Sequence, residues 1–327
     1  MWHDGRMKPA RRGREPKGPP ARRCEPIDLR TSDGWSLRAD VHEPGLAAAG
    51  TVVLAHALMA RRTEFDRPRG AGLAQFFVDR GWRVVAFDFR GHGESGPGPR
   101  EGANIGYDDY VTRDLPAVHA FARARGQRKR PVILVGHSLG GHAALAAQAA
   151  GLVAFDGLVL VAGNVWLREL EPSRLRWLIK RASLSVARTV GRRLGRFPAR
   201  ALRLGSDDES CAFFDDIERF ARTGRWASAD GRVDYLSSLA RVHVPVLQIL
   251  SDGDRFECSP ECGARFVAHC GGPHEILRVA RSDDGSPPPD HMGLVTSERA
   301  RSSWRQAEAW MRRCPCASNR LSDSSRT

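Results

Sequence analysis

Residues 132–141 contain a serine whose neighbours suit nucleophilic chemistry. Their sequence, Val-Ile-Leu-Val-Gly-His-Ser-Leu-Gly-Gly, places Ser138 in a Gly-X-Ser-X-Gly motif between an apolar run and the alanine-rich residues 141–150. This order predicts a strand that turns sharply into a helix, with Ser138 at the apex. Such a turn strains the serine backbone, and Gly136 and Gly140 leave the space in which strand and helix approach each other. The pattern predicts a nucleophile elbow.

A serine hydroxyl is a weak nucleophile at neutral pH, so it needs a histidine base that is oriented by an acid. A candidate acid follows the apolar run 244–251, which predicts a buried strand and ends in Asp-Gly-Asp-Arg. That turn would hold a carboxylate at the end of the strand. We favour Asp254 as the acid, and Asp252 is the alternative.

The candidate base comes after a further apolar strand at residues 275–279. A polar, proline-rich loop follows this strand and ends at His291. His269 and His274 lie within or beside predicted regular elements, so His291 is the predicted base. The chain order is nucleophile, acid and base, which is the order in α/β-hydrolases and differs from that in the other common serine hydrolase folds.

Two upstream segments add to this pattern. Residues 52–59 read Val-Val-Leu-Ala-His-Ala-Leu-Met, and residues 88–95 read Asp-Phe-Arg-Gly-His-Gly-Glu-Ser. With the elbow, they resemble the α/β-hydrolase superfamily over residues 27–313, and most of all the bacterial hydrolases of the serine aminopeptidase S33 and monoglyceride lipase-like group. The departure is Ala57, where this group usually has glycine.

The resemblance implies an oxyanion hole made of two backbone N–H groups. Leu139, next to the nucleophile at a helix N-terminus, is expected to supply one, and Leu58 the other, with Ala57 as the alternative. His56 and His92 are expected to orient these loops through hydrogen bonds. Other polar residues near the motifs are expected to pack or to brace the loops: His137, His142, Asp88 and Arg90.

The elements around these motifs indicate an α/β fold with a mostly parallel central sheet. Continuous apolar strands that alternate with helical segments are typical of a parallel sheet covered on both faces. A hairpin is expected within residues 27–41. The other expected strands are 51–56, 82–87, 132–135, 157–161, 244–251 and 275–279, and the expected helices are 64–80, 108–124, 139–150 and 258–270.

We expect a single α/β-hydrolase core, residues 26–163 and 241–313, with a helical lid of residues 164–240 inserted after the sixth strand. Apolar residues recur in the lid near helical spacing among many arginines. Their apolar face is expected to line an acyl pocket and exclude water, with Trp166 and Trp177 as candidates for its wall. The recurring residues are Trp166, Leu170, Leu175, Leu178, Ile179, Leu184, Val190 and Leu194.

The formal net charge of +13 is concentrated in the N-terminal tail and in residues 168–203. No nucleic-acid module accompanies it, so we expect no specific nucleic-acid partner and favour a solvated basic face over anionic substrate or lipid. Residues 1–25 are expected to be a disordered basic tail, and residues 314–327 a flexible one. The absence of a signal peptide and of a long apolar run favours a cytoplasmic protein with no transmembrane segment.

Seven cysteines without a secretion signal are expected to be free thiols. Some lie close enough in sequence to histidines to raise the question of zinc, but their spacing does not match a standard site. We therefore expect neither a metal nor a cofactor. The residues considered for zinc are Cys258, Cys262, His269, Cys270 and His274.

These features predict a serine hydrolase that cleaves small or medium carboxylic esters through an acyl-enzyme. The same Ser-Asp-His triad also serves thioesters, amides or peptides, and C–C bonds, because pocket shape sets the choice of leaving group. A serine at the elbow argues against a dehalogenase or an epoxide hydrolase, whose nucleophile in this fold is a carboxylate. The alternative from another class is a ligand-binding or scaffold protein that keeps the fold without turnover.

Overall fold

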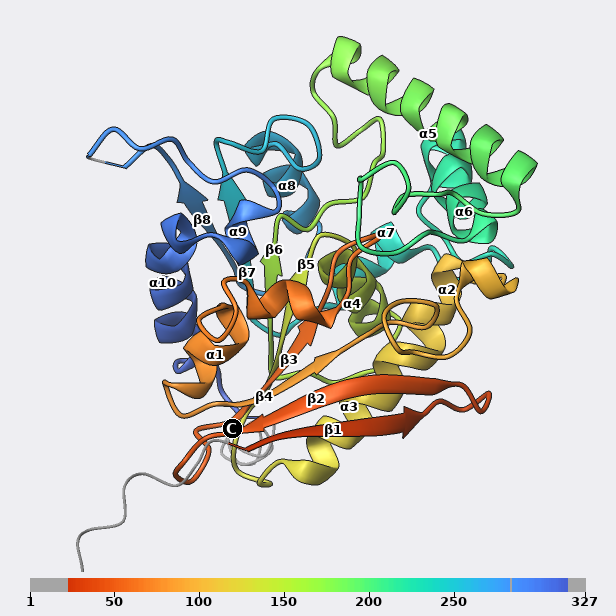
Figure 1. The fold of residues 1–327 in the computed structure, drawn as a ribbon. Helices are drawn as coiled ribbons and strands as arrows, with labels where there is room; N and C mark the ends of the chain where they lie inside the picture. Colours follow the sequence, from red (N-terminus) through yellow and green to blue (C-terminus); the bar gives the residue numbers. More distant parts are fainter. Residues whose placement is uncertain (1–22, 283, 317–327) are drawn as a thin grey trace, which may run out of the picture.

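The computed structural model describes residues 23–282 and 284–316, in which eight strands form one sheet (Figure 1). The strand order is β1-β2-β4-β3-β5-β6-β7-β8. β2 pairs antiparallel with β1 and β4, and all other pairs are parallel. The strands are β1 Arg23–Arg30, β2 Ser36–Glu43, β3 Thr51–Ala55, β4 Arg83–Phe87, β5 Val132–His137, β6 Gly157–Val161, β7 Val246–Ser251 and β8 His274–Val279.

Helices cover both faces of this sheet, so the predicted fold class is confirmed. Alternate residues of β3 and β5 enter two separate apolar cores, one packed by α3 and α4 and the other by α1 and α10. The helices are α1 Leu73–Val78, α2 Tyr107–Asp109, α3 Leu115–Arg125, α4 Leu139–Ala149, α5 Arg174–Leu194, α6 Cys211–Thr223, α7 Tyr235–Ser238, α8 Pro260–Val267, α9 Gly293–Thr296 and α10 Arg301–Met311.

The expected helix at residues 64–80 is wrong as a single element. The structure has a 3-10 turn at Arg62–Asp66 and then α1, separated by a loop that contains Pro68. At Gly72 the chain comes so close to this turn that an added Cβ would lie 2.3 Å from the carbonyl oxygen of Phe65. A continuous helix would not bring Gly72 against Phe65 in this way, and Pro68 lacks the N–H that the helical hydrogen-bond pattern needs.

The chain between β6 and β7, residues 162–245, carries α5 and α6 over the C-terminal ends of the strands and α7 beside α4 (Figure 1). We call it the β6–β7 segment. α5 and α6 enclose a small apolar core of their own, which contains Trp177, Leu184 and Phe214. The recurring apolar residues do not all lie on the apolar face that was expected to line a pocket, because four of them are exposed: Leu175, Leu178, Ile179 and Leu194.

The ends of the described chain differ slightly from expectation. β1 begins at Arg23, so residues 23–25 belong to the sheet and not to the N-terminal tail. At the other end Cys316 is buried. The rest of both expected tails, residues 1–22 and 317–327, lies outside the described residues. No helix in the described part of the chain is long and apolar enough to cross a membrane.

Candidate active site

The turn from β5 to α4 has the predicted geometry of a nucleophile elbow. Ser138 stands between the two elements with φ 50° and ψ −111°, a strained conformation for a residue with a side chain. A Cβ on Gly136 would lie 2.5 Å from the backbone of Gly140, and one on Gly140 would lie 2.2 Å from the carbonyl oxygen of Ala55. Glycine is therefore required at both positions.

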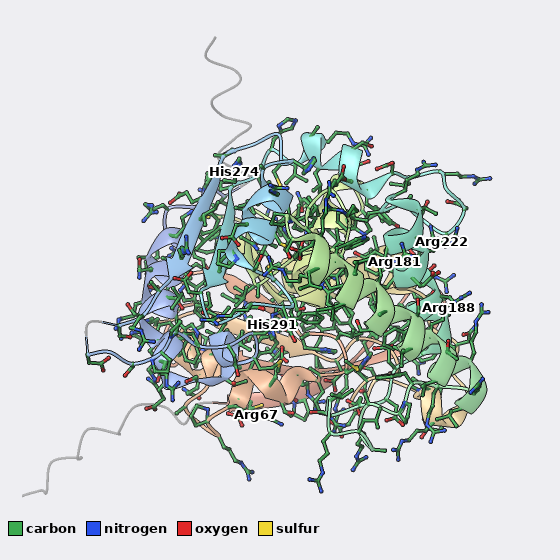
Figure 2. The ribbon with its side chains drawn as sticks, turned by 90° about the horizontal axis from the view of Figure 1, so that it is seen from above. Arg67, Arg181, Arg188, Arg222, His274 and His291 are labelled. Atoms are coloured by element: carbon green, nitrogen blue, oxygen red, sulfur yellow. The ribbon has the colours of Figure 1, made fainter. Side chains whose placement is uncertain are left out.

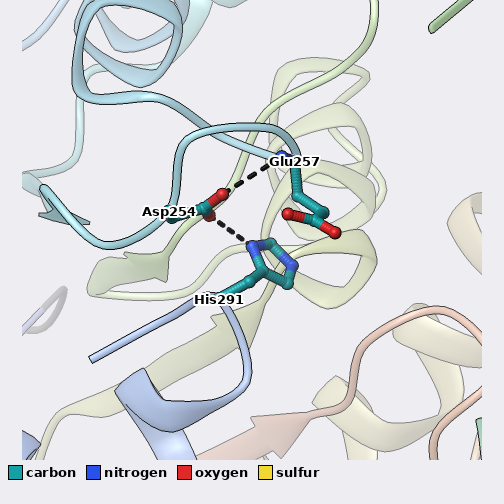
Figure 3. Close-up of side chains that lie close together, drawn as sticks. All are labelled: Asp254, Glu257 and His291. Carbon is teal, nitrogen blue, oxygen red and sulfur yellow. Dashed lines mark hydrogen bonds and ion pairs between the residues drawn. The ribbon is translucent and has the colours of Figure 1, made fainter. Parts of the chain in front are cut away.

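The predicted acid and base meet in a partly buried hydrogen bond. Nδ1 of His291 lies 2.5 Å from Oδ2 of Asp254 (Figure 3). The other oxygen, Oδ1, accepts hydrogen bonds from the N–H groups of Glu257 at 3.1 Å and Cys258 at 3.0 Å, so both oxygens of the carboxylate have partners. Asp252 instead accepts a bond of 2.6 Å from Arg278. Of the two candidate acids, only Asp254 bonds to His291.

Charges around His291 favour its protonated form. Burial alone would lower the pKa of His291, but the hydrogen bond and charge of Asp254, with the charges of Glu257 and Glu64, raise it above the usual value. Burial would likewise raise the pKa of Asp254, but its bond to His291 lowers it. Burial and the charge of Asp254 raise the pKa of Glu257. A carboxylate that sequence reasoning missed therefore acts on the base.

A second missed residue, Glu64, connects the three loops of the site. Its Oε1 accepts a bond of 3.1 Å from the N–H of Ala57 and lies 3.1 Å from Nδ1 of His137. Nε2 of His137 donates to the carbonyl oxygen of His291 at 3.1 Å, and the two imidazole rings are 5.0 Å apart. Because His137 precedes Ser138, this chain of contacts brings the base loop to the elbow.

The bond between Glu64 and Ala57 also affects which N–H groups are available for the predicted oxyanion hole. The N–H of Ala57 is engaged by Glu64, whereas among the described residues no acceptor bonds to the N–H of Leu58 or Leu139. The positive φ in this loop falls on Met59, at 57°, so the alanine at position 57 needs no left-handed conformation. Leu58 and Leu139 are thus the two predicted donors that remain free to bind an anion.

His56 and His92 orient loops through hydrogen bonds, as predicted. Nε2 of His56 accepts from the N–H of Phe89 at 3.0 Å, and burial lowers its pKa to about 3, so it stays neutral. His92 Nε2 lies 3.2 Å from Glu209, and although burial would lower the pKa of His92, that carboxylate raises it to about 9. His92 thereby connects the loop after β4 to the β6–β7 segment.

The other flanking residues also behave as predicted. Asp88 accepts a bond of 2.7 Å from the N–H of Arg62, and Arg90 donates to Asp114 at 2.7 Å, so both brace the loops beneath the site. His142 bonds to the hydroxyl of Tyr107 at 2.9 Å, inside the aromatic core.

The β6–β7 segment contacts the site on two sides. The carbonyl oxygen of Met59, beside the predicted oxyanion donor, accepts from the N–H groups of Ser206 at 2.8 Å and Asp207 at 3.1 Å. On the acid side, the indole of Trp166 donates to the carbonyl oxygen of Glu257 at 3.0 Å. The segment therefore spans from the loop of the predicted oxyanion donor Leu58 to the loop of the predicted acid Asp254.

Among the described residues, one group of three brings possible metal ligands within 4.8 Å of one another: Asp254, Glu257 and His291. None of the cysteines or histidines considered for zinc belongs to it, and all seven cysteines are free thiols.

Comparisons with known proteins agree with this fold. The sequence model of a family described as "Serine aminopeptidase, S33" matches residues 48–280. No curated protein matches the sequence. Solved structures with similar folds include an α/β hydrolase, GrgF, from Penicillium sp. sh18, with TM-score 0.59 and 15% identity over 90% of this chain and 99% of that one.

Two further structures extend the comparison. An esterase from Exiguobacterium antarcticum has TM-score 0.56 and 15% identity, over 87% of this chain and 98% of that one. A monoacylglycerol lipase from Paleococcus ferrophilus has TM-score 0.55 and 19% identity, over 84% of this chain and 98% of that one. At these identities the likeness establishes the α/β-hydrolase fold.

Proposed function

We propose that this chain, which belongs to the serine aminopeptidase S33 family of α/β-hydrolases, cleaves carboxylic esters through an acyl-enzyme formed on Ser138. The observation that carries the proposal is the Asp254–His291 pair, which His137 connects to the strained serine elbow through its bond to the carbonyl oxygen of His291. An acid–histidine pair of this kind serves catalysis by activating a nucleophile, which is Ser138 in this proposal. The esterase and lipase named among the structural neighbours favour an ester bond over the other acyl bonds.

In the proposed reaction, Nε2 of His291 takes the proton of Ser138 as Oγ attacks the ester carbonyl. The imidazolium then returns the proton to the leaving alcohol, and the acyl-enzyme remains. A water molecule then attacks the acyl-enzyme with His291 as its base, and the imidazolium passes this proton to Oγ of Ser138 as the acid is released. Asp254 holds Nδ1, so the free nitrogen of the ring is Nε2, and it stabilises the imidazolium while that exists.

The negative charge of the tetrahedral intermediate is proposed to be bound by the N–H groups of Leu58 and Leu139. In comparable sites each donor contributes about 3 kcal/mol to transition-state stabilisation. The N-terminus of α4 adds a favourable dipole at Leu139. Glu64 supports this role indirectly, since its bond to the Ala57 N–H holds the loop that presents Leu58.

We further propose that the β6–β7 segment covers the site as a lid, and that its inner side sets acyl preference. The support is its double attachment, to Met59 on one side and to the acid loop through Trp166 on the other. Its enclosed core includes Met59 among its partly buried members, which extends an apolar surface from the segment to the oxyanion loop. Such a surface suits an acyl chain and excludes water from the reaction.

The test is hydrolysis of a series of p-nitrophenyl esters by the wild type, Ser138→Ala and Ser302→Ala. Ser302 is exposed on α10 and serves as the matched control. Ser138→Ala should lower turnover by several orders of magnitude, up to ~10⁶ in comparable enzymes, while Ser302→Ala leaves it unchanged. Folded Ser138→Ala protein that keeps most of the activity would contradict the proposal. Faster cleavage of matched thioesters or aminoacyl amides would show that the preferred substrate is a thioester or an amide and not an ester.

A further inference from the structure

The helix α5 has two apolar faces, and the structure buries only one of them. The inner face packs on α6 through Trp177, Leu184 and Ala187. The outer face carries large apolar residues spaced at i, i+3, i+4 and i+11, which places them on one side of a helix. They are Leu175, Leu178, Ile179 and Val186, with exposed fractions of 69%, 64%, 49% and 63%.

This outer face is unusual within the described chain. Exposed large apolar residues occur singly elsewhere, but seven of the eleven fall between Leu175 and Leu204. Isolated exposed apolar residues are normal, whereas a contiguous patch marks an interaction surface. α5 also stands clear of the sheet as the outermost helix over the C-terminal ends of the strands (Figure 1).

The patch is bordered by positive charge. α5 is a 21-residue helix that contains arginines and a lysine but no aspartate or glutamate. Arg188 and Arg192 pair with Asp215 of α6, and Arg181 donates to the carbonyl oxygen of Ala221 on the same helix, with its Nε buried. The exposed Arg174 and Arg193 have no ion-pair partner among the described residues. Figure 2 shows Arg181 and Arg188 along α5, with Arg222 on the neighbouring helix.

We propose that the outer face of α5 docks onto the surface of a bilayer that contains anionic phospholipid. An amphipathic helix with large apolar side chains on one side and arginines at the border lies in the membrane interface, where its apolar side enters the acyl region and its cations meet lipid phosphates. α5 is about 30 Å long, so several side chains can enter the interface at once.

The charge of α5 favours lipid over the other possible occupants. A second copy of this chain, packed α5 against α5, would bring two helices without acidic residues together, and their unpaired arginines would repel. The basic N-terminal segment, residues 1–22, has the same sign of charge and does not complement this face. An anionic bilayer complements both the apolar stripe and its border.

The apolar part of the proposal is tested by flotation of the full chain with phosphatidylcholine vesicles, with and without phosphatidylglycerol. The wild type should bind the anionic vesicles. Leu178→Gln with Ile179→Gln should lower binding at least tenfold, while Leu46→Gln with Leu152→Gln, at exposed apolar residues outside α5, should bind like the wild type. Thermal melting of each variant shows that it is folded. The assay involves no catalysis, so failure of the proposed ester hydrolysis leaves its result intact.

The electrostatic part is tested with Arg174→Gln and Arg193→Gln combined, because both arginines are exposed. Each lost arginine should weaken binding to the anionic vesicles roughly fivefold at low salt. Equal binding of the wild type to neutral and anionic vesicles would overturn the assignment to anionic lipid. No vesicle binding by the folded wild type, or a dimer in sedimentation velocity that only the α5 variant disrupts, would overturn membrane docking altogether.

Discussion

Asp252 and Asp254 lie two residues apart in one turn, and their surroundings give them different roles. Asp254 is buried against His291, while Asp252 bonds to Arg278 at the surface. Asp254→Asn should lower kcat for p-nitrophenyl ester hydrolysis by about 10⁴, because the amide favours the wrong imidazole tautomer. Asp252→Asn should leave kcat nearly unchanged. The reverse ranking would transfer the role of the acid to Asp252.

Glu257 acts on the base through its charge. Its carboxylate is one of the groups that raise the pKa of His291. His291 must be neutral to accept a proton, so activity rises with pH through this pKa. Glu257→Gln removes a negative charge, lowers the pKa of His291 and should move the acidic limb of the kcat/KM profile to lower pH.

The control for this prediction is Glu261→Gln, which removes a carboxylate four residues further along, in α8. It should leave the pH profile in place. An acidic limb that stays at the wild-type pH in Glu257→Gln, or moves upward, would show that this carboxylate does not stabilise protonated His291.

At the scale of elements, two tryptophans of the β6–β7 segment are expected to behave differently. Trp166 bonds to the carbonyl oxygen of Glu257 beside the site, whereas Trp177 lies in the core between α5 and α6. Trp166→Ala should change the ratio of kcat/KM between long and short acyl esters. Trp177→Ala should keep that ratio and lower the free energy of unfolding by roughly 3 kcal/mol, as expected for a large cavity.

The measurement is a set of ester kinetics together with urea unfolding of both variants. Trp177→Ala protein with an altered acyl preference and full stability would place the pocket wall deeper in the segment. An unchanged preference in Trp166→Ala would remove this tryptophan from the pocket.

Local sequence patterns predicted the strands and the elbow because each depends on neighbouring residues. Asp254 and His291 were predicted from their places after the two last strands and from the chain order. The elbow needs only two glycines and a strand before a helix, and the strands are continuous apolar runs. Glu64 could not be found in this way, since its partner His137 lies 73 residues away and the partner of His137 lies 154 residues further. Such contacts depend on the assembled sheet.

The apolar pattern of α5 did not predict which side of the helix is covered, and the reason is different. Periodicity identified an amphipathic helix, but this helix has apolar residues on two sides. Only packing decides which side is covered, and here α6 covers the side of Trp177 and leaves that of Leu178 exposed. The helix at residues 64–80 was wrong because the close approach at Gly72 comes from tertiary structure.

For the whole molecule, the buried pair of His92 and Glu209 predicts a pH-dependent stability. The pKa of His92 is raised to about 9 in the folded protein, against 6.5 when exposed. Its contribution is therefore complete below pH 6.5 and is lost as pH rises through 9. Urea unfolding should show a decline on the order of 2 to 3 kcal/mol over this window.

His92→Gln is the matched variant, because it keeps a polar side chain but cannot titrate. Its free energy of unfolding should be lower at pH 6.5 and should fall less between pH 6.5 and 9. A decline as large as that of the wild type would assign the effect to other groups.

In the proposed mechanism the strained elbow presents Ser138 as a nucleophile that His291 and Asp254 activate. The most direct measurement is labelling with a fluorophosphonate, followed by mass spectrometry of the modified peptide. We expect one adduct, on Ser138, that is absent in Ser138→Ala and forms much more slowly in Asp254→Asn than in Asp252→Asn. A folded wild-type protein that does not react, or an adduct on another serine, would contradict it.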